Sequence, residues 1–95
     1  MRRYKLSKSA QNDLENIYRF GYLRFGQKQA DKYYLGLVKS FESIVANPLL
    51  YMRVDHIKPG YRKCVFVSER IYFRFENDMV IISAIIGRQD EIRRF

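Results

Sequence analysis

Hydrophobic and polar positions alternate through residues 60–88, the last third of the chain. β-Branched and aromatic residues dominate three runs there, in the proportion that half-buried strands favour. The polar pairs Ser68-Glu69 and Asn77-Asp78 separate the runs and are short enough to be hairpin connections. The pattern therefore predicts a three-stranded antiparallel meander, with strands over residues 60–67, 70–76 and 79–87.

Two stretches before the meander show the three- and four-residue spacing of amphipathic helices. Ser7 or Ser9 can cap the first helix, which ends at Phe25-Gly26. The second helix begins almost at once and ends at Asn47-Pro48. The expected buried stripes are Ala10, Leu14, Ile17 and Gly21 on the first helix, and Ala30, Tyr34, Leu37, Phe41 and Ile44 on the second.

These elements predict an α+β fold in two layers. The short link between the helices makes them an antiparallel hairpin, and packing this hairpin on the meander buries the apolar side of each. Residues 3–6 alternate and predict a first strand, whereas residues 49–58 have weak periodicity and predict a surface loop. A chain of 95 residues fits one domain, residues 1–95.

Charge is the strongest compositional signal. Eighteen Lys and Arg residues against ten Asp and Glu give a net charge of +8, which favours an acidic partner, either a nucleic acid, an acidic protein or an anionic surface. One cysteine is consistent with a reducing cytoplasm. No run approaches the roughly 20 apolar residues that a membrane span needs. We therefore expect a soluble cytoplasmic protein without a membrane partner.

Candidate catalytic groups are scarce. His56, the one histidine, falls in the predicted loop and is expected to be an ordinary exposed residue. Cys64 lies among apolar strand residues and is expected to act as a small hydrophobe. The sequence has neither metal-ligand spacing nor a glycine-rich phosphate loop, so we expect no metal and no cofactor.

Arginines and tyrosines are the functional side chains that remain. Alternation places Arg62 on the same face of the sheet as Cys64, and Arg74 on the same face as Arg70 and Tyr72. Such residues can neutralise phosphates or bind an acidic protein surface. Arg70 and Arg74 could equally be a solvated outer face of the sheet.

The order of these residues along the chain resembles the ParE branch of the RelE/ParE toxin superfamily, the toxic halves of bacterial type II toxin-antitoxin systems. The likeness covers nearly the whole chain. The residues that carry it in the first half are Tyr4-Lys5-Leu6-Ser7, Ala10, Asp13-Leu14, Ile17, Phe25-Gly26, Ala30, Tyr33, Leu37, Phe41, Ile44 and Asn47-Pro48. Those in the second half are Gly60, Arg62, Ile71-Tyr72-Phe73-Arg74 and Ile85-Ile86-Gly87-Arg88-Gln89-Asp90.

The resemblance implies a β-α-α-β-β-β fold, with the first strand beside the last strand of the meander. It also implies one of two activities. RelE-like members cut messenger RNA on the ribosome, using basic residues with, in many, a C-terminal Tyr or His. ParE-like members lack that nuclease set and poison DNA gyrase, stalling the enzyme with broken DNA.

The sequence departs from the nuclease pattern at two places. The position before Gly87-Arg88 often carries His in the superfamily, but here it is Ile86, and the tail ends Arg93-Arg94-Phe95 without a Tyr. The resemblance therefore favours a plasmid-maintenance type of toxin that binds gyrase and traps its DNA-cleavage complex without catalysing a reaction itself. The runner-up is a ribosome-dependent mRNA endonuclease with Arg62, Arg74 and Arg88 as catalytic residues.

Partners follow from the resemblance and the charge. A co-expressed antitoxin, ParD-like or similar, is expected to bind through an acidic segment and form a toxin-antitoxin hetero-oligomer. DNA gyrase is the second partner, and contact with nucleic acid is expected to be indirect. The residues expected to bind partners are Arg62, Arg74, Arg88, Arg93 and Arg94. A third hypothesis is an inert module that retains only antitoxin binding.

Overall fold

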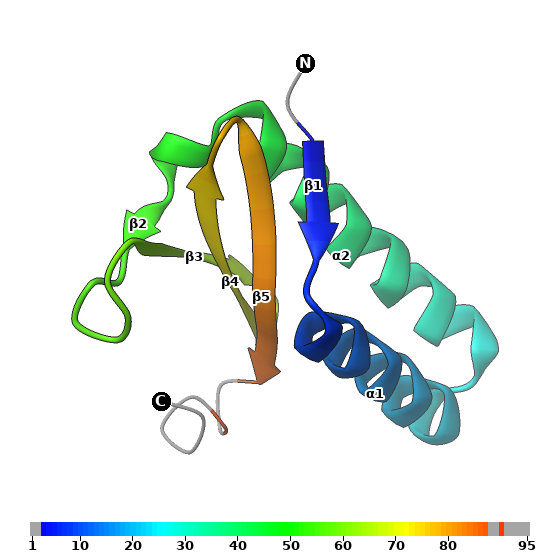
Figure 1. The fold of residues 1–95 in the computed structure, drawn as a ribbon. Helices are drawn as coiled ribbons and strands as arrows, with labels where there is room; N and C mark the ends of the chain where they lie inside the picture. Colours follow the sequence, from blue (N-terminus) through cyan, green and yellow to red (C-terminus); the bar gives the residue numbers. More distant parts are fainter. Residues whose placement is uncertain (1–2, 88–89, 91–95) are drawn as a thin grey trace.

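The computed structural model describes residues 3–87 and residue 90, and it shows a helical hairpin packed on one face of a twisted sheet (Figure 1). This is the predicted α+β arrangement in two layers. The helices are α1 (Lys8–Phe25) and α2 (Gln27–Ala46), followed by a single 3-10 turn, η1 (Pro48–Leu50). The strands are β1 (Arg3–Leu6), β2 (Met52–Arg53), β3 (Tyr61–Phe66), β4 (Glu69–Glu76) and β5 (Met79–Gly87).

The strands form one sheet in the order β1-β5-β4-β3-β2. β1 lies parallel to β5, and the other pairs are antiparallel, so the expected position of the first strand beside the last is confirmed. Asn77 and Asp78 make the β4–β5 turn as predicted, with φ angles of 52° and 60° that suit a tight hairpin. The β3–β4 turn was predicted one residue too late, because Glu69 already pairs with Phe66.

The prediction of a loop over residues 49–58 is wrong in two respects. Met52 and Arg53 pair with β3 as a fifth strand, and Val54 is fully buried. A two-residue strand contains no alternation, and a lone valine in a polar segment carries no periodicity. Neither feature could therefore be read from the pattern.

The helix boundaries and most of their buried positions agree with the sequence pattern. Ser7 is the cap of α1, and its hydroxyl accepts a hydrogen bond from the Ala10 N–H at 3.1 Å. On α2 the buried stripe was wrong at one position, because Tyr34 is exposed and its neighbour Tyr33 packs against the core. The buried residues of α2 are Ala30, Leu37, Phe41 and Ile44.

Two apolar clusters lie on opposite faces of the sheet. The larger is between sheet and helices, and the smaller is on the outer face, where Val54 and Ile57 of the β2–β3 loop pack on the strands. The larger cluster contains Ala10, Leu37, Phe41, Ile44, Cys64, Ile71, Phe73, Val80, Ile82 and Ile85. The strand residues of the smaller cluster are Tyr61, Tyr72, Ala84 and Ile86. Both faces of the sheet are therefore partly buried.

A register shift in β5 determines which residues reach each face. Tyr72 pairs with Ala84 and Phe73 pairs with Ile82, so Ser83 is an extra residue in β5, a β-bulge. Beyond the bulge the alternation of β5 is inverted relative to a regular strand. Ile85 consequently joins the helix-side cluster, while Ala84 belongs to the outer one.

No helix within the described residues is both long and apolar enough to cross a membrane.

A glycine-to-alanine pair tests how closely α2 packs on the sheet. A Cβ at Gly36 would lie 2.4 Å from Phe66 Cζ, whereas one at Gly21 would meet Ala30 at an ordinary 3.7 Å. We expect Gly21→Ala to raise the free energy of unfolding by about 0.5–1 kcal/mol, the helix preference of alanine over glycine. Gly36→Ala should lower it by about 1 kcal/mol or more, because displacing a packed ring outweighs that gain.

Urea unfolding monitored by circular dichroism measures both variants. Adding Phe66→Leu to Gly36→Ala removes the ring and should recover part of the loss. If both alanine variants raised the free energy of unfolding equally, the Phe66 ring would have moved aside at no cost. The close packing of α2 on this ring would then not contribute to stability.

Candidate functional site

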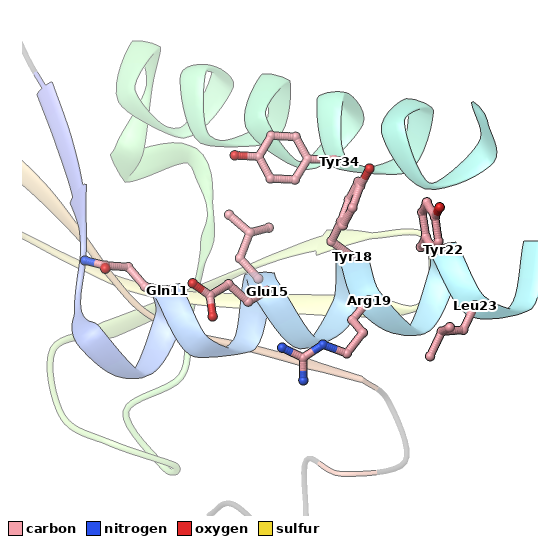
Figure 2. Close-up of a pocket in the computed structure, with 8 residues that line it drawn as sticks. Gln11, Glu15, Tyr18, Arg19, Tyr22, Leu23 and Tyr34 are labelled. Atoms are coloured by element: carbon pink, nitrogen blue, oxygen red, sulfur yellow. The ribbon is translucent and has the colours of Figure 1, made fainter. Parts of the chain in front are cut away.

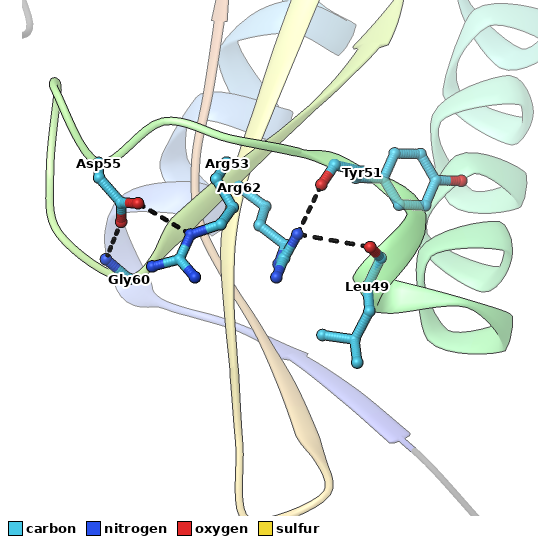
Figure 3. Close-up of polar contacts among 6 residues, drawn as sticks. All are labelled: Leu49, Tyr51, Arg53, Asp55, Gly60 and Arg62. Carbon is cyan, nitrogen blue, oxygen red and sulfur yellow. Dashed lines mark hydrogen bonds and ion pairs between the residues drawn. The ribbon is translucent and has the colours of Figure 1, made fainter.

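Arg62 has a structural environment, which Figure 3 shows. Its side chain lies at the helix-side edge of β3 and donates through Nη1 to the Tyr51 carbonyl oxygen at 2.8 Å and to the Leu49 carbonyl oxygen at 3.4 Å. Tyr51 in turn packs edge-on against Phe73, with ring centroids 5.8 Å apart. The guanidinium therefore fastens the segment between η1 and β2 to the sheet.

The neighbouring loop is held by a second polar group, also drawn in Figure 3. Asp55 accepts from Arg53 Nε at 2.8 Å and from the Gly60 N–H at 2.8 Å. These two hydrogen bonds, the one from Arg53 first, hold the pKa of Asp55 below its usual value. Gly60 has a φ of 82°, a conformation that glycine adopts without strain. The loop thereby brings Val54 and Ile57 onto the outer face.

Arg74 has a different environment, on the outer face of the sheet. It donates through Nη1 to the phenolic oxygen of Tyr61 at 3.0 Å and through Nε to Glu76 at 3.1 Å. Ser83 donates to the same phenolic oxygen at 3.3 Å. Ser83 reaches this position because it is the extra residue of the β5 bulge, and a bulge changes the direction in which a side chain points.

These contacts shift the ionisation of Tyr61. Burial raises the pKa of Tyr61, but the hydrogen bonds from Ser83 and Arg74 and the charges of Lys58 and Arg74 outweigh that effect, so the pKa lies below its usual value. The Lys58 ammonium is 5.0 Å from the centre of the Tyr61 ring. The outer face therefore combines a phenol, a guanidinium and an ammonium group within one small area.

Two side chains at the start of the first helix hold the bulge in place from the helix side of the sheet. Asp13 accepts from the Ile85 N–H at 3.0 Å, and the Ser7 hydroxyl donates to the Ser83 carbonyl oxygen at 3.1 Å. The hydroxyl that begins α1 and a carboxylate in its second turn thus bind β5 on both sides of Ala84. The position of Ser83 beside Tyr61 depends on these anchors.

The predicted site arginines are therefore divided between two faces. Arg62 is on the helix side, the face it was expected to share with Cys64, and Arg74 is on the outer side, the face it was expected to share with Tyr72. The structure does not bring these two guanidinium groups together. Arg88, Arg93 and Arg94 lie outside the described residues.

The two candidate catalytic groups occupy the expected environments. His56 is exposed in the β2–β3 loop. Cys64 is 8% exposed, and burial raises the pKa of its thiol, which disfavours the reactive thiolate. Within residues 3–87 and residue 90, no three His, Cys, Asp or Glu side chains lie close enough together to hold a metal ion.

Tyr61, Ser83 and Lys58 were missed by the sequence reasoning. Tyr61 follows the predicted Pro59-Gly60 turn and was counted only as a strand residue. Its contact with Arg74 follows from strand pairing, since Tyr61 and Arg74 are register partners. Pairing the two strands through the predicted Ser68-Glu69 turn would have placed Tyr61 opposite Glu76, so the contact depends on the true position of the turn. The approach of Ser83 depends on a bulge that leaves no sequence signal.

A groove runs between the two helices on the side remote from the sheet core (Figure 2). Tyr18 lies at its centre, 6.0 Å from Tyr34 and 6.4 Å from Tyr22 between ring centroids. The Tyr18 hydroxyl donates to Asp31 at 2.6 Å, and this hydrogen bond raises the pKa of Tyr18. The residues that line the groove are Gln11, Leu14, Glu15, Tyr18, Arg19, Tyr22, Leu23 and Tyr34.

Comparison with known proteins identifies the family. The family model described as "ParE toxin of type II toxin-antitoxin system, parDE" matches residues 4–92. This match includes the sheet, the helical hairpin and the arginines on both faces. The chain belongs to the ParE toxin family.

Similar proteins support the same assignment. Toxin ParE1 of Mycobacterium tuberculosis (strain H37Rv) is 37% identical over 90 residues, covering 93% of this chain and 92% of the relative. Toxin ParE1 of Caulobacter vibrioides is 31% identical over 74 residues, covering 78% and 77%. A solved structure described as the chromosomal ParDE TA system from P. aeruginosa has a TM-score of 0.81 at 20% identity, covering 92% of this chain and 96% of that chain. The ParE fold is therefore shared with this structure.

Glutamine substitutions distinguish the structural arginine of this ParE-family toxin from an ordinary surface arginine. Arg62→Gln removes the donor to two backbone carbonyls, and we expect it to lower the free energy of unfolding by about 1–2 kcal/mol. Arg53→Gln breaks an ion pair between two exposed side chains and should change stability much less than Arg62→Gln does. Urea unfolding measures both. Equal effects would mean that Arg62 does not stabilise the edge of the sheet.

Proposed function

We propose that this ParE-family toxin inhibits growth by binding DNA gyrase and trapping the cleavage complex, without catalysing a reaction itself. The observation that supports this proposal best is the environment of Ile86. This position often carries His in the RelE/ParE superfamily. Here the side chain is 2% exposed and packs in the outer-face cluster with Val54 and Tyr72. An apolar packing residue thus occupies the place of a proton-transfer group.

The alternative is a ribosome-dependent mRNA endonuclease, and one contact favours it. Tyr61 accepts from Arg74 and has a lowered pKa, as a general base beside a phosphate-binding guanidinium would require. However, Tyr61 is only 8% exposed, and its oxygen already accepts two hydrogen bonds. We therefore rank gyrase above the ribosome as the target.

Two parallel reactions with purified toxin test the choice. One contains gyrase, supercoiled plasmid and ATP and is scored for linear DNA after protein removal, and the other is a translation reaction scored for cleaved mRNA. We expect linear DNA and intact mRNA. Reactions without gyrase provide the blank. Cleaved mRNA with intact plasmid would replace the proposal with the nuclease.

Tyr61→Phe provides a matched control for both reactions, because it removes only the phenolic oxygen. A gyrase poison should keep its DNA-cleavage activity within about threefold in this variant. A nuclease that uses Tyr61 as base should lose about 10²-fold or more of its mRNA cleavage rate. Circular dichroism of the variant confirms that it is folded.

An antitoxin is the second partner in the proposal. The solved P. aeruginosa structure is described as a ParDE TA system, and the present chain carries a net charge of +8 that suits an acidic segment. The hairpin offers such a segment a largely apolar groove, whose lining includes one cation, Arg19, and one carboxylate, Glu15. Exposed apolar side chains near the far end are Phe20, Leu23 and Phe25, and the Arg24 guanidinium lies over two of these rings, 5.6 and 5.9 Å from their centres. We propose that an acidic amphipathic helix of the antitoxin occupies the groove.

The same substitution, leucine to glutamate, at two exposed positions tests where the antitoxin binds. Leu23 lines the groove and is 77% exposed, whereas Leu50 in η1 is 81% exposed and remote from it. Leu23→Glu should stay toxic but escape neutralisation, because it places a carboxylate against an acidic helix. Leu50→Glu should still be neutralised. Growth with and without co-expressed cognate antitoxin measures both, and normal rescue of the Leu23 variant would exclude the groove.

A further inference from the structure

A line of cationic side chains crosses the outer face of the sheet at right angles to the strands. Lys5 of β1 pairs with Ile81 of β5, Ile81 pairs with Arg74 of β4, and Arg74 pairs with Tyr61 of β3. Lys58 follows in line, since its ammonium lies over the Tyr61 ring. We call Lys5, Arg74 and Lys58 the basic row. It is made by residues far apart in sequence, which strand order alone brings together.

The surroundings of the basic row are also mostly cationic. By register, Arg3 flanks it on β1 beside Met79, and Lys63 flanks it on β3 beside Tyr72. Glu76, the carboxylate that shares this face on β4, is already paired with Arg74. Lys5 and Lys58 are exposed, and 37% of the Arg74 side chain is exposed. The row therefore presents two exposed ammonium groups at its ends, with the partly exposed guanidinium of Arg74, paired with Glu76, between them.

The spacing suits an extended polyanion. Neighbouring strands are about 4.8 Å apart, so Lys5 and Arg74, two strands apart, are separated by roughly 10 Å at their backbones. The cations then lie in a line with apolar Ile81 between them. A linear array of this kind matches a backbone that carries one charge per nucleotide better than it matches a single small anion.

The aromatic residues of this face discriminate between duplex and single-stranded ligands. Single strands are held by stacking bases on exposed aromatic rings. Tyr61 and Tyr72 on the outer face are 8% and 0% exposed, so their rings cannot stack on bases. Among the described residues, the exposed aromatic side chains are instead on the helical hairpin, on the other side of the sheet: Phe20, Tyr22, Phe25 and Tyr34. The outer face can bind phosphates without reading bases.

We propose that the basic row is a binding site for the phosphate backbone of duplex DNA. The contact is independent of base sequence and is made by the toxin directly, without any other protein. It goes beyond the proposed inhibition of gyrase, and it can hold whether or not gyrase is the target. On a gyrase complex that holds cleaved DNA, such a contact would add to the affinity of the toxin for the enzyme.

Fluorescence anisotropy with purified toxin and a labelled 20-base-pair DNA duplex tests the site without gyrase. The probes for comparison are a duplex RNA and a single-stranded RNA of the same sequence. We expect micromolar binding of the DNA duplex at 50 mM salt, weakening linearly with the logarithm of salt concentration. Single-stranded RNA should bind more weakly than the duplex.

Two variants with the same loss of charge assign the binding to the face. Lys5→Gln/Lys58→Gln removes both ends of the basic row, and it should weaken duplex binding roughly 10- to 50-fold at 0.1 M salt and reduce the salt slope by about 2. Lys28→Gln/Lys32→Gln removes two exposed lysines of α2 and should change affinity less than about threefold. Circular dichroism confirms folding of both.

Three results would overturn the proposal. These are the absence of duplex binding at 50 mM salt, equal weakening by the two double variants, and tighter binding of single-stranded RNA that depends on Lys5 and Lys58. The last result would identify the face as an RNA site. Linear plasmid in the gyrase reaction together with absent duplex binding would leave the gyrase proposal intact and remove only this inference.

Discussion

The bulge at Ser83 is the constraint on which the arrangement of both faces depends. A regular strand through β5 would place Ile82 and Ala84 on one face and Ile81 and Ile85 on the other. The extra residue inverts the second half, so that Ile82 and Ile85 both fill the helix-side cluster. The smaller Ala84 then lies over the outer cluster, where Tyr72 needs room. One added residue thus lets a continuous apolar strand serve two cores.

The helix that begins beside the bulge keeps it in place. Ser7 uses one hydroxyl twice, accepting from the Ala10 N–H and donating to the Ser83 carbonyl oxygen, and Asp13 accepts from the Ile85 N–H. A bulge leaves backbone groups without ladder partners, and a buried unpaired group costs about 1–3 kcal/mol. Ser7 and Asp13 provide hydrogen-bond partners for two backbone groups of β5 next to the bulge. The hairpin therefore has a second role besides covering the core, which is to position Ser83 beside Tyr61.

Residue type alone does not reveal what an arginine does in this fold. Arg62 and Arg74 are both strand arginines at intermediate exposure, yet the first binds backbone carbonyls of its own chain and the second lies in a cationic line on the open face. The difference follows from alternation along neighbouring strands and from what each face packs against. A loss of toxicity on changing Arg62 would therefore report on folding, whereas Arg74 can report on a partner.

The sequence was sufficient to predict secondary structure where the hydrophobic periodicity is strong. Two amphipathic helices, a cap at Ser7 or Ser9, the meander and the turn at Asn77-Asp78 could all be predicted, because each is encoded by neighbouring residues. Three features could not. β2 is too short to show alternation, and the nine residues of β5 are too uniformly apolar to reveal a bulge. Tyr33 and Tyr34 are adjacent residues of the same type, so the sequence does not show which of them is buried. The basic row belongs to the same class, because it exists only after the strand order is known.

The two proposed surfaces lie on opposite sides of the sheet, and this separation has a consequence for neutralisation. The apolar groove is on the helical hairpin, and the basic row is on the face that the hairpin leaves open. Apolar contacts in the groove depend little on salt, whereas charge contacts of an acidic antitoxin segment weaken as salt is added, and phosphate contacts weaken steeply. An antitoxin confined to the groove would leave the basic row free to bind DNA. If neutralisation instead abolishes DNA binding, the antitoxin must extend around the edge of the sheet, and an acidic chain crossing from groove to basic row would compete with phosphate for the same cations.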